Sequence, residues 1–255
     1  DIIRRRQESL WRAKYAKLYQ AIQSASDLLA AIAILPHTIE SAAIGLEKYQ
    51  SDWYRIDQQY RWFTYAHQTA DFQKPLEELK TEVDKQYANK FLYDFGGLWQ
   101  QALEPMNEWK SAALAPQSKF FDRHVAPVVK DGRTKAVVII SDGMRYEIAE
   151  ELASLVRSEN RFDASLSAVL GSLPSYTQLG MASLLPQSSL ELDPNALPVL
   201  ADGKPTNGTA NRDKILQVVN GHALTAADVL AMPGSELREL YTKHQIFYVY
   251  HDRID

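Results

Sequence analysis

The sequence contains no cysteine, which excludes disulfide frameworks, thiolate metal sites and thiol nucleophiles together. It also lacks any apolar run near the roughly 20 residues that a membrane-spanning helix needs. The longest candidates, residues 28–35 and 137–140, are far shorter. Neither sign of charge dominates, because 28 Lys and Arg stand against 32 Asp and Glu, and the net charge is −4. This balance argues against strong unaided binding to nucleic acid or to an anionic membrane, and the absence of cysteine favours a cytoplasmic protein.

The overall composition is that of an ordinary globular protein, with 45% hydrophobic and 24% charged residues in a chain of 255. The chain begins Asp-Ile-Ile-Arg, without an initiating methionine or the apolar stretch of a signal peptide. We therefore expect this sequence to be a piece of a longer protein.

The first half of the sequence has the apolar periodicity of α-helices. Apolar residues recur every three or four positions in four runs, over residues 11–32, 39–63, 76–91 and 98–113. Pro36 separates the first two runs, which predicts a helical hairpin, and the fourth run is expected to continue across Pro105. Together the runs predict an N-terminal helical bundle over residues 1–117.

Two features of this bundle also allow a binding function. One is a locally basic first helix, with Arg4, Arg5, Arg6, Arg12, Lys14 and Lys17. A solvated helix face explains these residues better than a phosphate-binding patch does. The other is an aromatic stripe that includes Trp53, Tyr60, Trp62 and Phe63. Such a stripe can stack on bases, but its spacing is more typical of core packing, so we interpret both features as structural.

The pattern changes after Pro116. Residues 118–134 predict a linker, because they contain a proline and an Asp-Gly turn pair. Residues 135–140 are a short β-branched apolar run, which is typical of a central strand buried on both faces. A polar turn and a helix at 144–157 follow, so the order strand, turn, helix opens a second domain over residues 135–255.

The remainder of this domain continues the alternation. A second strand is predicted at 162–170, a short helix at 176–184 and a loop at 187–208. The last predicted elements are three helices and a buried strand, at 211–219, 225–232, 235–244 and 246–250. This order predicts an α/β fold with a mostly parallel sheet behind the helical bundle.

Polar residues follow the predicted strands. Asp142 comes after the first strand, Thr177 soon after the second, and Asp255 after the last. Because α/β proteins bind ligands at the carboxyl ends of parallel strands, we expect these three residues to converge at one edge of the sheet. Carboxylates with a hydroxyl suit a hard or borderline divalent cation. A pair of such cations can activate a hydroxyl for phosphoryl transfer.

Each candidate also has a structural interpretation. Asp142 before a helix is also explained as an N-cap, and Thr177 as an ordinary residue of a first helical turn. His244 and His251 are possible metal ligands, but a histidine near a strand end more often makes structural hydrogen bonds.

Three segments, in this order, closely resemble the PglZ domain. They are Val-Ile-Ile-Ser-Asp142-Gly-Met-Arg-Tyr-Glu147-Ile-Ala-Glu-Glu-Leu152, Leu173-Pro-Ser-Tyr-Thr177-Gln-Leu-Gly-Met-Ala-Ser-Leu-Leu-Pro186 and Tyr248-Val-Tyr-His-Asp-Arg-Ile-Asp255. The PglZ family belongs to the alkaline phosphatase superfamily and is a core component of the BREX and Pgl phage-defence systems of bacteria. The resemblance covers residues 135–255, and the bundle is similar to the region ahead of the catalytic domain in type A members.

The resemblance implies a metal-dependent phosphatase or phosphodiesterase with a threonine nucleophile and two sites for divalent ions, with Zn or Mn expected. Asp142 matches an aspartate that ligates one metal, and Asp255 matches the aspartate that binds the second. Thr177 matches the nucleophile of a Pro-x-x-Thr motif, here Pro174-Ser-Tyr-Thr177, and would also contact the first metal. Residues 203–212 resemble a further family segment, for which we assign no role.

In the superfamily the remaining metal ligands lie beyond the position of Asp255. The resemblance therefore implies a truncated alkaline-phosphatase-like domain that is inactive as this piece. It also implies, as partners, other BREX-type defence proteins and a phosphoester substrate, with nucleic acid as one candidate and no membrane. The alternative is a non-catalytic scaffold that recruits defence proteins through its bundle.

Overall fold

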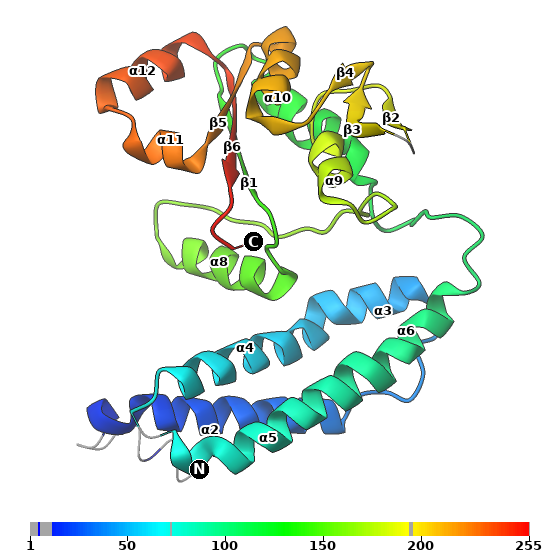
Figure 1. The fold of residues 1–255 in the computed structure, drawn as a ribbon, viewed down its shortest axis with the longest axis vertical. Helices are drawn as coiled ribbons and strands as arrows, with labels where there is room; N and C mark the ends of the chain where they lie inside the picture. Colours follow the sequence, from blue (N-terminus) through cyan, green and yellow to red (C-terminus); the bar gives the residue numbers. More distant parts are fainter. Residues whose placement is uncertain (1–4, 6–11, 72, 194–195, 255) are drawn as a thin grey trace. The chain divides into compact units, whose positions relative to one another are not determined.

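The computed structural model describes residues 5, 12–71, 73–193 and 196–254. The chain forms two compact units, and each is built from two separate stretches of sequence. The helical unit comprises Asp1–Glu108 and Arg145–Ser165, and the α/β unit comprises Trp109–Met144 and Leu166–Asp255 (Figure 1). The predicted N-terminal helical bundle and the α/β fold are both confirmed. The domain limits at 117 and 135 stay a prediction.

From residue 12 onward, the described part of the helical unit consists of three long helical arms and one shorter helix. Its elements are α2 (Arg12–Ala33), α3 (Ala42–Lys48), η1 (Tyr49–Trp53), α4 (Tyr54–Gln68), η2 (Lys74–Leu76), α5 (Glu77–Lys85), η3 (Gln86–Phe95), α6 (Gly96–Leu103) and α8 (Tyr146–Ser158). Elements α3 to α4 follow one another without a break, and so do η2 to α6. The third and fourth predicted helices are therefore one continuous arm.

This arm ends at Leu103, so the expected continuation across Pro105 is wrong. Proline disfavours helical geometry in the residue before it and lacks the N–H of a helical hydrogen bond, which explains the end point. At the other end of the unit, Trp11, Arg4 and Arg6 lie outside the described residues, whereas Arg5 and Lys14 are exposed.

The core of the helical unit is aromatic and aliphatic. Its buried members come from α2, α4 and the third arm, and they include Leu28, Ile56, Phe63, Val83 and Phe91. Trp53 and Tyr60 are partly buried against this core, and the ring of Tyr60 stacks on that of Tyr87 at 3.8 Å between centroids. The interpretation of the aromatic stripe as core packing is therefore confirmed for Trp53, Tyr60 and Phe63.

The α/β unit contains a parallel sheet and a small antiparallel sheet. Its strands are β1 (Ala136–Ser141), β2 (Leu190–Asp193), β3 (Ala196–Ala201), β4 (Lys204–Pro205), β5 (Gly221–Thr225) and β6 (Ile246–His251). Its helices are η4 (Gln117–Lys119), η5 (Phe121–Val125), α7 (Ala126–Val129), α9 (Thr177–Ser183), α10 (Gly208–Leu216), η6 (Gln217–Val219), α11 (Ala226–Ala231) and α12 (Gly234–Lys243). The strands β1, β6 and β5 are parallel in that order, and β2, β3 and β4 form the antiparallel sheet.

The parallel sheet differs from the prediction in its strands. The expected strand at 162–170 is not formed, and only Leu170 makes an isolated bridge, with Pro116. Strand propensity alone does not make a strand, because a strand also needs a neighbouring strand to pair with and side chains to pack against. The third strand is instead β5, which the sequence analysis missed because its five residues include glycine, histidine and threonine.

Strand β1 was expected to be buried on both faces, and this is wrong. It is an edge strand of the sheet within the described residues, and Val137 and Ile139 are 56% and 69% exposed. The central strand is β6, whose Ile246, Phe247 and Tyr248 are buried. The opposite face of β1, with Ala136 and Ile140, packs into the core of the unit.

Two stretches that were expected to lack regular structure contain helices or strands. The expected linker at 118–134 carries most of three short helical segments, whose Phe121 and Val125 join the core. The expected loop at 187–208 contains the β2–β3–β4 sheet, in which β3 turns into β4 through Asp202 and Gly203. Both of these residues have positive φ, 47° and 73°, as such a tight turn between strands requires.

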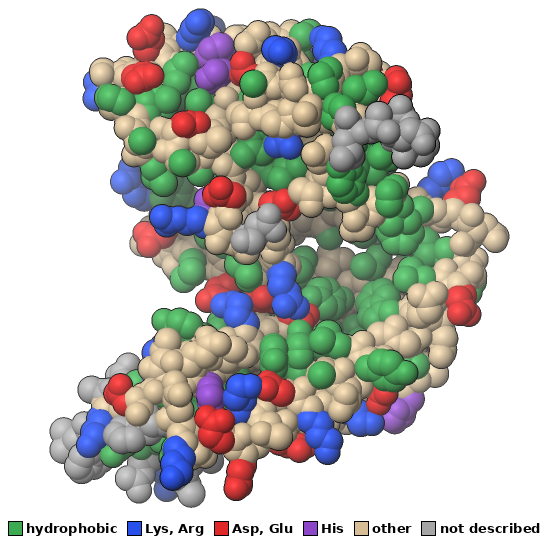
Figure 2. Space-filling model, in the orientation of Figure 1, with side chains coloured by type: hydrophobic (Ala, Val, Ile, Leu, Met, Phe, Trp, Pro, Cys, Tyr) green, Lys and Arg blue, Asp and Glu red, His purple; other side chains and the backbone are tan. Residues whose placement is uncertain are grey.

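The surface carries mixed charge. Figure 2 shows acidic and basic side chains interspersed over the visible face of each unit. This agrees with the near balance of charge in the sequence. Among the described helices, none combines the length and the apolar character that crossing a bilayer demands.

Candidate functional site

A pocket of about 330 Å³ lies in the α/β unit at the carboxyl end of β1. Four parts of the chain line it: the start of η4, the end of β1, the loop before α9, and α9 with the residue that follows it. The lining residues are Gln117, Ile140, Ser141, Asp142, Gly171, Ser172, Ser175, Tyr176, Thr177, Gly180, Met181 and Leu184. The pocket therefore contains two of the three residues singled out in the sequence, Asp142 and Thr177. The third, Asp255, lies outside the described residues.

Asp142 sits in a sharp turn directly after β1. Its Oδ1 accepts a hydrogen bond from the backbone N–H of Gly143 at 3.1 Å, and Gly143 has a positive φ of 70°. The helix that follows begins at Tyr146, and its N-cap position is Arg145. The interpretation of Asp142 as an N-cap is therefore wrong, and its carboxylate is half-buried.

Thr177 is the first residue of α9 and is exposed. Tyr176 occupies the N-cap position with extended backbone, and its side chain makes no capping hydrogen bond. Within the described part of the chain, no hydrogen bond is recorded for the hydroxyl of Thr177. A hydroxyl presented in this way at a pocket wall is accessible to a ligand.

The ends of β1 and β6 are joined beside Asp142. Ser141 and His251 are register partners, and Ser141 Oγ lies 3.0 Å from His251 Nδ1. The backbone N–H of Asp142 also donates to the carbonyl of His251 at 3.4 Å. His251 thus has a structural hydrogen bond, as the second interpretation of this residue expected.

His244 lies at the opposite end of β6, just before the strand begins. Its ring stacks on that of His222 at 4.9 Å, and Asp213 Oδ1 lies 2.7 Å from His222 Nδ1. Burial, followed by the neighbouring His222, lowers the pKa of His244. Because parallel strands place Asp142 at their carboxyl end, His244 does not belong to the pocket of Asp142.

The loop before α9 is held by two side chains that sequence analysis did not select. Trp109 Nε1 donates to the carbonyl of Gly171 at 2.8 Å. Gln117 donates through its backbone N–H to Leu170 at 2.8 Å and through its side chain to Gly180 at 3.3 Å. Trp109 was expected in a helix, but it follows the end of α6 at Leu103. No local sequence pattern marks Trp109 or Gln117 as a support of the pocket.

The described residues offer part of a metal site. The carboxylate of Asp142 and the hydroxyl of Thr177 are hard oxygen donors of the type that divalent cations accept, and both line one pocket. No cluster of three or more histidine and acidic side chains suited to a metal occurs within the described ranges. The chemistry of these donors fits a divalent cation. Among the described residues, Asp142 and Thr177 are the two donors that we assign to it.

Comparison with known proteins identifies the family. Residues 120–255 match the model of the BREX system PglZ alkaline phosphatase-like domain, which is more than half of the chain. The chain belongs to the PglZ family. It is 35% identical to the alkaline phosphatase-like protein BrxZ of Escherichia coli O9:H4 (strain HS), over all of this chain and 31% of that protein. It is also 35% identical to the alkaline phosphatase-like protein PglZ of Bacillus cereus (strain H3081.97), over 97% of this chain and 29% of that protein.

The chain thus spans about a third of the length of these curated PglZ relatives. Its match to the family model begins at residue 120, whereas both relatives align with the helical unit as well. The helical unit is therefore shared with PglZ proteins rather than added to this chain.

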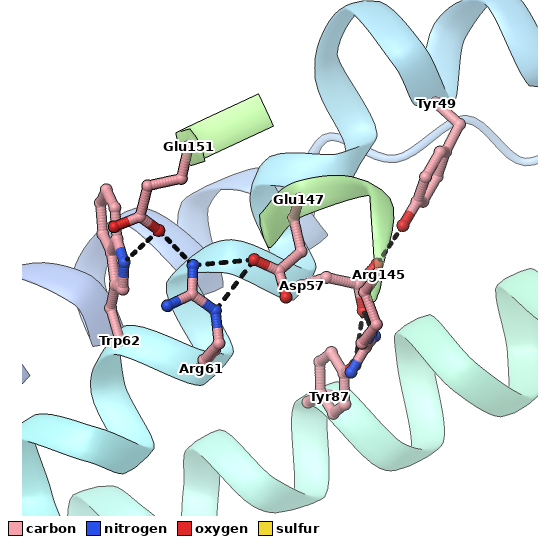
Figure 3. A network of polar contacts seen from close by, with 8 residues as sticks. All are labelled: Tyr49, Asp57, Arg61, Trp62, Tyr87, Arg145, Glu147 and Glu151. Carbon is pink, nitrogen blue, oxygen red and sulfur yellow. Dashed lines mark hydrogen bonds and ion pairs between the residues drawn. The ribbon is translucent and has the colours of Figure 1, made fainter. Parts of the chain in front are cut away.

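The PglZ motif that contains Asp142 continues into a polar network of the helical unit (Figure 3). Asp57 of α4 is 4% exposed and accepts three hydrogen bonds. The donors are the hydroxyls of Tyr49 and Tyr87, at 2.7 and 2.6 Å, and Nη2 of Arg145, at 2.6 Å. Burial, and then the hydrogen bond to Asp57, raises the pKa of Tyr87 to about 12. The two tyrosines therefore remain protonated donors at neutral pH.

The same network contains a second buried carboxylate, Glu147 of α8. It is fully buried and accepts a hydrogen bond from Nε of Arg61 at 2.9 Å. Arg61 also forms an ion pair with Glu151, which accepts from Nε1 of Trp62 at 3.2 Å (Figure 3). The motif residues that follow Asp142 thus anchor the first turns of α8 on α4, a role that the sequence analysis did not foresee.

Proposed function

We propose that the full-length protein hydrolyses phosphoesters in a metal-dependent reaction with Thr177 as the nucleophile. The observation that carries this proposal is the shared pocket of Asp142 and Thr177, which are 35 residues apart in the sequence. A hydroxyl that lines the same pocket as a carboxylate is a candidate nucleophile, because a metal ion held by the carboxylate would activate it. Membership of an alkaline phosphatase-like family supports the same reaction class.

Asp142, Thr177 and Asp255 would hold two divalent cations, with Zn or Mn as the expected ions. When bound, such ions lower the pKa of a hydroxyl and offset the negative charge of phosphoryl oxygens. The protein contributes placement: the Gly143 turn fixes the carboxylate of Asp142, and the loop held by Trp109 and Gln117 leads to Thr177. In this proposal the Thr177 oxygen bonds to phosphorus as the alcohol leaves, and water then releases phosphate and regenerates the hydroxyl.

The name of the family model refers to the BREX system, and this supports a role for the full-length protein alongside other components of such a system. We propose that other BREX-type proteins are the partners of the full-length protein and that its reaction serves phage defence. The substrate is a phosphoester, and nucleic acid is one candidate.

The test is substitution of the nucleophile in the full-length protein. Thr177→Ala should lower hydrolysis of p-nitrophenyl phosphate, measured with Mn²⁺ or Zn²⁺, by at least about 10³-fold, because no other group replaces the hydroxyl. Thr177→Ser should retain part of the activity. The control is Thr242→Ala, which removes a hydroxyl that donates to the carbonyl of Arg238 within α12. Activity of Thr177→Ala near the parental level would exclude this nucleophile, and a parent without metal binding or turnover would favour the scaffold function.

A further inference from the structure

Helix α12 is only lightly packed against the parallel sheet. Figure 1 shows that α11 and α12 form the connection between β5 and β6. None of the residues of Gly234–Lys243, all of which the structure describes, is buried, and Leu240 alone is half-buried. Most of the stability of a helix in a protein comes from packing, so a helix that buries this little is weakly held. The contacts at its ends therefore decide how firmly α12 is attached.

The last turn of α12 is attached to the sheet by a cation and by rings. The ammonium of Lys135, just before β1, donates to the carbonyls of Tyr241 and His244, the latter at 2.6 Å. The ring of Tyr241 stacks on that of Phe247 of β6, with 5.9 Å between centroids. The ring of His244 lies edge-on to Phe247 at 6.3 Å and stacks on His222 of β5 at 4.9 Å. The imidazole of His244 is thus a direct contact between the end of α12 and two strands.

This imidazole occupies a position that suits its neutral form. Its Nδ1 is buried and has no hydrogen-bond partner among the described residues. The neutral ring can carry its proton on Nε2, whereas the protonated ring also has an N–H at Nδ1. Protonation would therefore place a charge and an unbonded donor in a buried position, which is unfavourable.

The charged and titratable groups around His244 come from four parts of the α/β unit. They are Lys243 of α12, Lys135 before β1, His222 of β5 and Asp213 of α10. Burial contributes most to lowering the pKa of His244, followed by His222 and the two lysines, whereas Asp213 acts in the opposite direction. The carboxylate of Asp213 is bonded to His222, with Oδ1 2.7 Å from Nδ1. The surroundings of His244 thus disfavour a positive charge on its ring.

We propose that the His222–His244 stack is a pH-sensitive latch, which holds the last turn of α12 on the sheet and releases it when His244 is protonated. Release uncovers the ring of Phe247, which is 4% exposed beneath Tyr241 and His244. Phe247 is the register partner of Val137, which is 56% exposed, and register partners project to the same face of a sheet. The released state therefore presents a larger apolar surface on this face. The latch does not depend on the proposed phosphoester hydrolysis.

The direction of the pH dependence follows from the two states of His244. In the released state its ring is in water and has the ordinary pKa of about 6.5. Because the pKa is lower in the latched state, the latch is complete above about pH 6.5 and is lost as pH falls through the lowered value. One protonation can raise the equilibrium constant for release by at most about 10-fold between pH 7.5 and pH 5.5.

Hydrogen exchange of the full-length protein, followed by mass spectrometry at pH 7.5 and pH 5.5, tests the latch. Protection factors are compared, because they remove the direct effect of pH on amide exchange. We expect the protection of α12 to fall about 3- to 10-fold at the lower pH, while that of α10 changes by less than about 2-fold. His244→Phe keeps a ring that can stack, removes the unbonded Nδ1 and cannot be protonated. In this variant the protection of α12 should differ by less than about 2-fold between the two pH values.

His124→Phe is the matched control, since it makes the same exchange at an exposed histidine of η5 in the same unit. In this control α12 should lose protection at pH 5.5 as it does in the parent. The latch is excluded if α12 of the parent is equally protected at both pH values, or if α12 of His244→Phe loses as much protection as the parent. If His244→Phe does not fold, His244→Gln is also uncharged at both pH values and provides the same comparison. Neither result bears on the role of Thr177, because no turnover is measured.

Discussion

The polar groups of the helical unit and those of the α/β pocket are arranged in opposite ways. In the helical unit, the carboxylate of Asp57 is buried and accepts from three donors. In the pocket, Asp142 accepts one local hydrogen bond from Gly143, and Thr177 is exposed. A buried carboxylate that is fully bonded contributes to stability, whereas a carboxylate and a hydroxyl that remain available serve a ligand. The motif shared by both regions, from Asp142 to Glu147, therefore divides its residues between two tasks.

The largest effect on stability is expected from Asp57→Ala. Loss of this carboxylate leaves the guanidinium of Arg145 and two tyrosine hydroxyls without their acceptor, which should lower the free energy of unfolding of the helical unit by about 3–5 kcal/mol. Hydrogen exchange in α4 and α8 of the full-length protein measures this loss locally. Asp163→Ala, at an exposed site in the same unit, is the control and should change exchange little. If the amides of α8 keep their protection from exchange in Asp57→Ala, the buried carboxylate does not stabilise the helical unit as we expect.

A smaller effect is expected from the pH dependence of Tyr87. Its pKa is raised to about 12 in the folded protein. The contribution of the protonated hydroxyl is therefore complete below its unfolded pKa of about 10 and is lost as pH rises to about 12. The contribution is about 1–2 kcal/mol after allowance for its partial solvation. Thermal unfolding followed by circular dichroism between pH 9 and pH 12 should show a smaller decline for Tyr87→Phe than for the parent, although the variant begins less stable. Parallel declines would assign the alkaline transition to another group.

The smallest effect on stability is expected from Asp142→Ala, which should change the free energy of unfolding by less than about 0.5 kcal/mol. The same variant should weaken binding of Mn²⁺ or Zn²⁺ at least about 10-fold, as measured by calorimetry on the full-length protein. This pairing of a small structural effect with a large effect on metal binding is what distinguishes the two regions. A loss of stability comparable to that of Asp57→Ala would show that Asp142 is structural as well.

Much of the fold was predictable because periodicity is local. The helices α9 to α12 and the strands β1 and β6 follow the predicted ranges closely, since each is a contiguous pattern. Strand β5 and the β2–β3–β4 sheet escaped prediction because their residues are polar, short in extent or interrupted by proline. Pairing with distant strands, rather than propensity, fixes these elements.

The site was partly predictable for the same reason. Asp142 and Thr177 stand next to recognisable elements, and the structure places both in one pocket. The network around Asp57 was not predictable, because Arg145 is 88 residues away along the chain and no local signal connects the two. The roles of Asp142, Thr177 and Asp255 stay predictions until metal binding and turnover are measured.

The interrupted sequence of the helical unit also has a consequence for biosynthesis. Its first stretch, through residue 108, leaves the ribosome before residues 145–165, which carry Arg145 and Glu147. During that interval Asp57 lacks its partner Arg145, although Tyr49 and Tyr87 are already translated. Arg61 lacks both Glu147 and Glu151, so the nascent helices stay hydrated at this position. Completion of the unit must wait until α8 has been translated, and a release of the chain before that point yields helices with unmatched charges.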